Sequence, residues 1–141
     1  MHLMSRTRLF ELLRDPPVPG AAVPPPPLPE AQMRLHLFSA RFYDAEAARR
    51  FAYADEEDRP TPMNRELEGA FVNPDEVEVV HGQVRTRLLD FLDTPVADGI
   101  VKRMGRDNTL IMVTELAFGG LPYDLTDTRT LTYLGAILVD V

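Results

Sequence analysis

The chain has 141 residues, a formal net charge of −7 and no cysteine. This length fits one domain plus a tail, and an apolar fraction of 45% is ordinary for a globular protein. The absence of cysteine excludes disulfides, thiol catalysis and thiolate metal sites and agrees with a cytoplasmic location. The acidic balance argues against nucleic acid or an anionic membrane as partner and favours a basic protein surface.

The first 33 residues differ in composition from the rest. Residues 5–14 have the apolar spacing of a short helix, but five charged residues among positions 1–15 do not fit a secretory leader. Residues 16–29 contain eight of the thirteen prolines, so we expect residues 1–33 to be a disordered or polyproline-like tail. An alternative is a misplaced start codon, with Met33 as the true first residue. An intact mass of the native protein separates the two explanations.

Residues 34–141 are expected to form a single domain, and their pattern alternates between strand and helix. Residues 35–43 alternate like a strand. Asp44 is a good N-cap for a helix over residues 44–53. Residues 76–81 alternate acid and valine, with Val77 and Val79 predicted to point inward.

The second half begins with helical patterns and ends with apolar runs. Helices are predicted over residues 83–93 and, after a proline at the first helical position, over 95–104. Residues 109–118 and 130–139 are rich in β-branched and aromatic residues and are predicted to be neighbouring strands. The sequence therefore predicts an α+β fold: a mainly antiparallel sheet of about four strands with helices packed on one face.

No motif for catalysis, metal binding or cofactor binding is present. The three histidines are not at ligand spacing, and neither of the two serines lies in a nucleophile elbow. The pair Gly119-Gly120 lacks the lysine and helix of a phosphate loop. We therefore predict a protein that is not an enzyme and assign no catalytic residue, metal or cofactor.

The connection from Gly119 to Arg129 is longer than a tight hairpin needs. Long loops with apolar and aromatic side chains often serve recognition. Tyr123, Asp124 and Asp127 are therefore candidate partner-binding residues. In the other interpretation, Leu121 and Leu125 of this loop pack back onto the core.

A second candidate surface is the densest acidic run of the chain. Its residues are Asp55, Glu56, Glu57 and Asp58. Such a run suits a basic protein partner. A solvated loop explains the same run without any partner.

Four short stretches, residues 37–44, 71–75, 108–113 and 131–136, follow one another in a particular order. With the acidic helix start and the acidic loop between them, this order resembles the immunity protein 22 family of bacterial polymorphic toxin systems. Members carry a tryptophan in the first strand, where this chain has Phe38. The resemblance covers residues 34–141. It implies a small α+β protein that binds and neutralises a cognate toxin without catalysis, and a basic target such as a nuclease toxin.

Two alternatives stay open. One is a small ligand-binding domain or enzyme with a pocket between sheet and helices, built from Tyr43, Tyr53, His81 and Tyr133. The other is a homodimer joined through an open sheet edge. The sequence does not give the oligomeric state.

Overall fold

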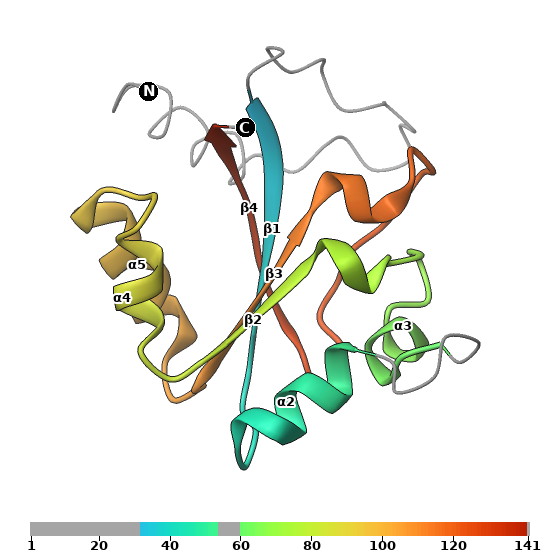
Figure 1. Ribbon diagram of the computed structural model, residues 1–141, viewed down its shortest axis with the longest axis horizontal. Helices are drawn as coiled ribbons and strands as arrows, with labels where there is room; N and C mark the ends of the chain where they lie inside the picture. The colour runs from blue at the N-terminus through green and yellow to red at the C-terminus, as the bar shows by residue number, and fades with distance from the viewer. Residues whose placement is uncertain (1–31, 54–59, 141) are drawn as a thin grey trace.

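The computed structural model describes residues 32–53 and 60–140 (Figure 1). One antiparallel sheet contains four strands in the order β2-β3-β1-β4. The strands are β1 (Gln32–Ala40), β2 (Val77–His81), β3 (Thr109–Thr114) and β4 (Thr132–Asp140). The strand β1 begins within the predicted tail, because Gln32 pairs with Asp140 and Met33 with Val139.

Short helices connect the strands. They are α2 (Ala45–Ala52), α3 (Pro62–Glu66), α4 (Val84–Leu88) and α5 (Thr94–Met104), with 3₁₀ turns η1 (Pro74–Glu76) and η2 (Glu115–Phe118). Asp44 caps α2 as predicted, since its carboxylate accepts a hydrogen bond of 2.7 Å from the Ala47 N–H. The helix predicted over residues 83–93 is regular only as far as Leu88, whereas the next helix matches its prediction closely.

The α+β class and the four-stranded antiparallel sheet are confirmed, but the prediction that helices cover one face is wrong. Viewed close to edge-on, the sheet has α4 and α5 on one side and α2 and α3 on the other (Figure 1). Leu37 and Leu110 pack with α4 and α5. Phe38 and Ile111 pack with α2 and α3 on the opposite face. The central strands β1 and β3 carry apolar residues at successive positions, so both of their faces need cover.

The prediction that the two C-terminal strands are neighbours is wrong, because β1 lies between β3 and β4. The long connection over residues 115–131 allows this, since it is long enough to carry the chain past one strand. A bulge interrupts β4 where the register shifts opposite Leu37 and Phe38. Gly135 sits there with a φ of 97°, which a residue with a side chain rarely adopts.

Candidate binding surface

The connection between η2 and β4 is held in a fixed conformation by Glu66 at the end of α3. The Glu66 carboxylate accepts hydrogen bonds from the hydroxyls of Thr128 and Thr130, both at 2.6 Å, and from the Thr130 N–H at 3.0 Å. Burial raises the pKa of this carboxyl, but the hydrogen bonds outweigh it and the pKa of Glu66 is lowered overall. Glu66 is therefore a structural anchor of the loop.

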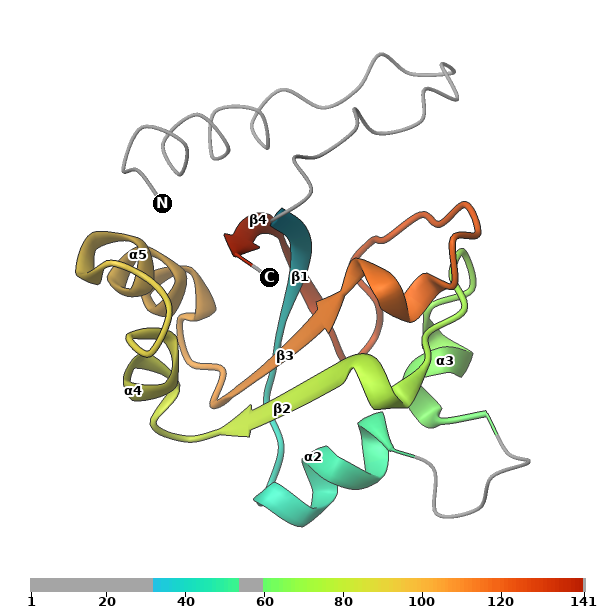
Figure 2. The ribbon, with the colours of Figure 1, turned by 45° about the horizontal axis from the view of Figure 1, so that its top comes forward.

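Two segments far apart in the sequence lie side by side at this end of the molecule (Figure 2). The Asn73 N–H donates to the Ala117 carbonyl at 2.9 Å, and the Asp124 N–H donates to the Gly69 carbonyl at 3.0 Å. A side chain at Gly69 would start 2.8 Å from the Asp124 carbonyl oxygen, so only glycine allows this close approach. Residues 69–73 and 117–124 thus run antiparallel to each other.

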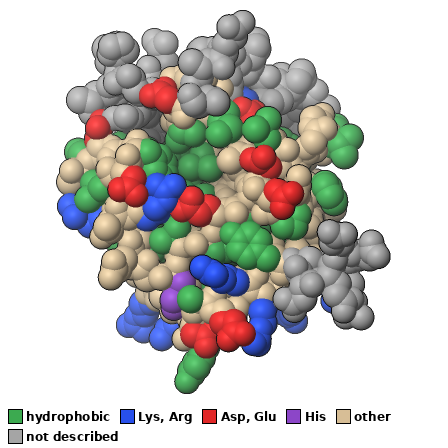
Figure 3. All heavy atoms as spheres, viewed as in Figure 1, with side chains coloured by type: hydrophobic (Ala, Val, Ile, Leu, Met, Phe, Trp, Pro, Cys, Tyr) green, Lys and Arg blue, Asp and Glu red, His purple; other side chains and the backbone are tan. Residues whose placement is uncertain are grey.

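Large apolar side chains stand exposed on these two segments or directly beside them. Phe71 is 60% exposed, Leu116 62% and Leu121 60%. Figure 3 shows hydrophobic and acidic side chains interspersed over the region of η2. Exposed apolar side chains that gather in one region mark a site of interaction more often than isolated ones do.

A groove of about 530 Å³ adjoins this area between residues 65–69 and 124–129. Its lining includes four carboxylate residues and two arginines, namely Glu66, Glu68, Asp124, Asp127, Arg65 and Arg129. The excess of carboxylates gives the groove a net negative charge. We call the exposed Phe71, Leu116 and Leu121, together with Glu68, Asp124 and Asp127, the loop surface.

Tyr123 has a different place from its two predicted companions, Asp124 and Asp127. Its ring stacks on Phe118 with centroids 3.8 Å apart, and its hydroxyl lies 3.0 Å from Nε2 of His36. Asp124 and Asp127 stay exposed on the loop, although the Asp127 carboxylate also accepts a 2.8 Å hydrogen bond from the Tyr133 N–H. The half-buried Tyr123 therefore supports the loop from beneath.

His36 contacts the hydroxyls of both Tyr123 and Tyr133 beneath the loop. It lies on β1 with only 4% of its surface exposed, and Nδ1 is 2.8 Å from the Tyr133 hydroxyl. Because a neutral imidazole has one donor and one acceptor, one tyrosine donates to the ring and the other accepts from it. Burial, helped by the charge of Arg34, lowers the pKa of His36 to about 4. Burial likewise raises the pKa of Tyr133. Both groups are therefore neutral near pH 7.

Of the other predicted residues, Asp55, Glu56, Glu57 and Asp58 lie outside the described residues. The four residues of the alternative pocket do not come together. His81 on β2 and Tyr133 on β4 belong to opposite edges of the sheet. Tyr43 is 97% exposed, and the Tyr53 hydroxyl donates to the Val77 carbonyl at 2.8 Å.

Sequence reasoning missed the contributions of Phe71, Glu66 and His36. Phe71 precedes a turn signal, and nothing local distinguishes an exposed phenylalanine from a core one. The partners of Glu66 and His36 are 62 to 97 residues away in the chain. Such contacts have no local signal.

Among residues 32–53 and 60–140, no three histidine, aspartate or glutamate side chains are grouped so that they could hold a metal ion. No helix in that part of the chain is both long enough and apolar enough to cross a membrane. No protein-family model, no curated protein and no solved structure matches this chain. The resemblance to the immunity protein 22 family therefore stays a prediction.

Proposed function

We propose that this chain is a non-catalytic, inhibitor-like protein that binds and neutralises a toxin with a basic surface. The observation that carries the proposal is the loop surface, where the two segments joined by backbone hydrogen bonds carry exposed apolar side chains and exposed carboxylates close together in sequence. Apolar side chains surrounded by charge are the usual composition of a protein-binding site. The carboxylates select a basic partner, and the apolar side chains supply most of the affinity.

The anchoring of the loop adds to this support. A loop that must be ordered on binding loses affinity, because the ordering entropy opposes association. Here Glu66 fastens the far end of the connection, while Gly69 and Asn73 fasten the near end through the backbone. The surface is thus formed before a partner arrives.

The alternative of a ligand-binding pocket or an enzyme has less support. Its predicted residues are spread over opposite edges of the sheet, and His36 donates and accepts within its own tyrosine pair. The groove between residues 65–69 and 124–129 is open to solvent. A small ligand needs more enclosure than such a groove offers.

The test is a pull-down from a lysate of the source organism with the full chain as bait, at low and at moderate salt. One bait variant combines Glu68→Gln with Asp124→Asn. A matched control combines Asp90→Asn with Asp98→Asn near α4 and α5, which changes the net charge equally. A third bait, Leu121→Ser, removes one exposed apolar side chain.

We expect one basic partner, retained at low salt, weakened by the first variant and by Leu121→Ser, and unaffected by the control. The recovered partner is then assayed for toxicity or enzymatic activity with and without the chain, and inhibition is expected. If the control pair loses as much partner binding as the first variant, the binding face is not the loop surface. A partner that binds without losing its activity would contradict the inhibitor role.

A further inference from the structure

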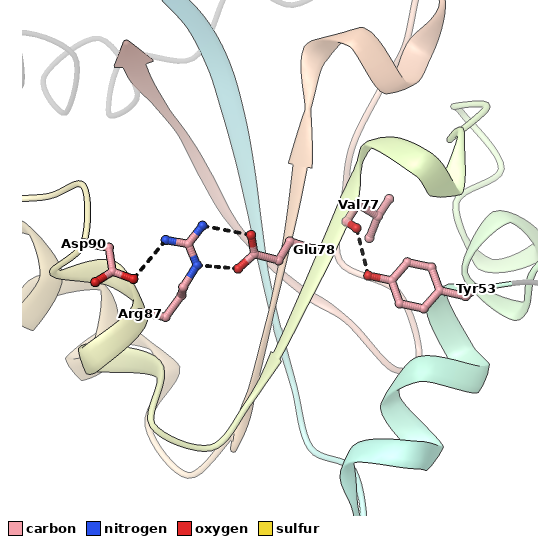
Figure 4. Close-up of polar contacts among 5 residues, drawn as sticks. All are labelled: Tyr53, Val77, Glu78, Arg87 and Asp90. Carbon is pink, nitrogen blue, oxygen red and sulfur yellow. Dashed lines mark hydrogen bonds and ion pairs between the residues drawn. The ribbon is translucent and has the colours of Figure 1, made fainter. Parts of the chain in front are cut away.

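The outer edge of β2 is closed by side chains from the neighbouring helices (Figure 4). The Tyr53 hydroxyl from the end of α2 donates to the Val77 carbonyl. Arg87 of α4 donates twice to the Glu78 carboxylate, from Nε at 2.6 Å and from Nη2 at 2.9 Å, and Arg87 also reaches Asp90. Charged and hydrogen-bonded side chains of this kind keep an edge strand from pairing with another chain.

Within the part of the chain that the structure describes, no such protection covers the outer edge of β4 over most of its length. Near the start of the strand, the Asp127 carboxylate accepts a hydrogen bond from the Tyr133 N–H. Beyond that point, no segment within residues 32–53 and 60–140 pairs with the outer side of β4. Residues 135–139 read Gly-Ala-Ile-Leu-Val and contain no charge and no proline. Such an edge presents alternate backbone N–H and C=O groups to any strand that fits.

Apolar side chains flank this open edge. Leu138 and Val139 of β4 and Val101 of α5 are only partly buried against the core cluster that α5 covers. A strand added beside β4 would cover their exposed parts. It would also continue the sheet with the same antiparallel geometry that its other strands have.

We propose that two copies of the chain associate through antiparallel pairing of β4 with β4, forming one continuous sheet. A two-fold axis near Leu138 places Ala136 of each copy opposite Asp140 of the other, so no like charges face each other. Because residues 135–139 are uncharged and apolar, an identical strand is a matching partner. A charged strand would find no opposite charges at this edge to pair with. This interface lies on an edge separate from the loop surface and does not depend on the proposed function.

The pairing is expected to be modest in strength. Five residues a side bury less than the roughly 1,200 Å² typical of stable interfaces, so the dimer should dissociate on dilution. Each copy carries a net charge of −7, so the copies repel each other at low salt. Salt therefore strengthens this dimer, whereas it weakens binding to a basic partner.

The experiment combines sedimentation velocity of the full chain over a wide concentration range with single-cysteine crosslinking. The natural sequence has no cysteine, so any disulfide formed by Leu138→Cys, which faces its own copy across the proposed two-fold axis, joins two molecules. Opposed residues of antiparallel strands have Cα atoms about 4.5–5.5 Å apart, within the range that a disulfide spans. The matched control is Val80→Cys, a partly buried valine on the protected edge strand β2.

We expect a concentration-dependent dimer that forms more readily at high salt and crosslinks at position 138 but not at 80. A charged side chain at the edge, Val139→Lys, should weaken the dimer by about tenfold or more, while the unfolding midpoint reports whether the variant folds. If Val139→Lys fails to fold, the cysteine comparison decides alone. A strict monomer, crosslinking as strong at position 80, or a dimer that Val139→Lys leaves unchanged would overturn the proposal.

Discussion

The two edges of the sheet are secured by different kinds of contact. At β2, side chains from the end of α2 and from α4 bind the edge from outside. One of them, Tyr53, donates a hydrogen bond to the Val77 backbone carbonyl. At β4, the main side-chain contact is internal, since the Tyr133 hydroxyl is bound by His36 of the neighbouring strand β1. Contacts of the first kind both fasten a strand and block further pairing. Contacts of the second kind fasten the strand without covering its outer edge.

The largest loss of stability is expected when the internal contact at β4 is removed. His36→Ala leaves a cavity and two tyrosine hydroxyls without their partner, so the free energy of unfolding should fall by about 3 kcal/mol. The control is His81→Ala, which removes the 2.9 Å contact of His81 with Thr109 at the other edge of the sheet. Because His81 is only partly buried, its loss should be about 1 kcal/mol. Urea unfolding measures both, and equal losses would contradict the comparison.

The same histidine makes stability depend on pH. The folded protein holds His36 neutral down to a pKa of about 4, whereas the unfolded chain takes up this proton near 6.5. Its contribution is complete above pH 6.5 and is lost as the pH falls toward 4. Since one pKa unit corresponds to 1.36 kcal/mol, the loss approaches about 3 kcal/mol. Urea unfolding at several pH values measures the slope, and His36→Gln should flatten it between pH 6.5 and 4.

A smaller effect is expected when the ion pair at the β2 edge is broken. Arg87→Leu removes a bidentate contact to Glu78, and because both side chains are partly exposed the loss should be about 1 kcal/mol. Arg85→Leu is the control, since Arg85 contacts the more exposed Asp98 through Nε at 2.6 Å. Thermal unfolding should show little change for Arg85→Leu. A control loss as large as that of Arg87→Leu would mean that the Glu78 contact has no special role.

The smallest change in stability is expected from Tyr53→Phe, but it should change how the β2 edge behaves. Removing one hydroxyl frees the Val77 carbonyl and lowers stability by about 0.5–1 kcal/mol. In the Val80→Cys background, this opening should raise disulfide crosslinking between molecules. Tyr43→Phe, at a tyrosine that is 97% exposed, is the control and should change neither quantity. Unchanged crosslinking in Tyr53→Phe would show that the hydroxyl does not protect the edge.

The candidate site was only partly predictable from the sequence. The length and composition of the loop after Gly119 predict a recognition site, and Asp124 and Asp127 do lie exposed on this loop. The two interpretations of its leucines are each half right, since Leu121 is exposed and Leu125 is partly buried against the core. The sequence predicts Tyr123 to be an exposed contact residue, yet its hydroxyl turns inward to a histidine 87 residues away. A local pattern cannot tell an aromatic side chain that faces solvent from one that completes a distant polar cluster.

Local sequence patterns predict the approximate positions of most strands and helices, because periodicity and capping act over a few residues. The Asp44 cap of α2 and the inward Val77 of β2 are both local effects. By contrast, the position of β1 between β3 and β4, the cover of both sheet faces by helices and the different protection of the two edges by the described residues are set by long-range contacts. These features depend on contacts such as Glu66 with Thr130, whose partners meet only after the chain has folded.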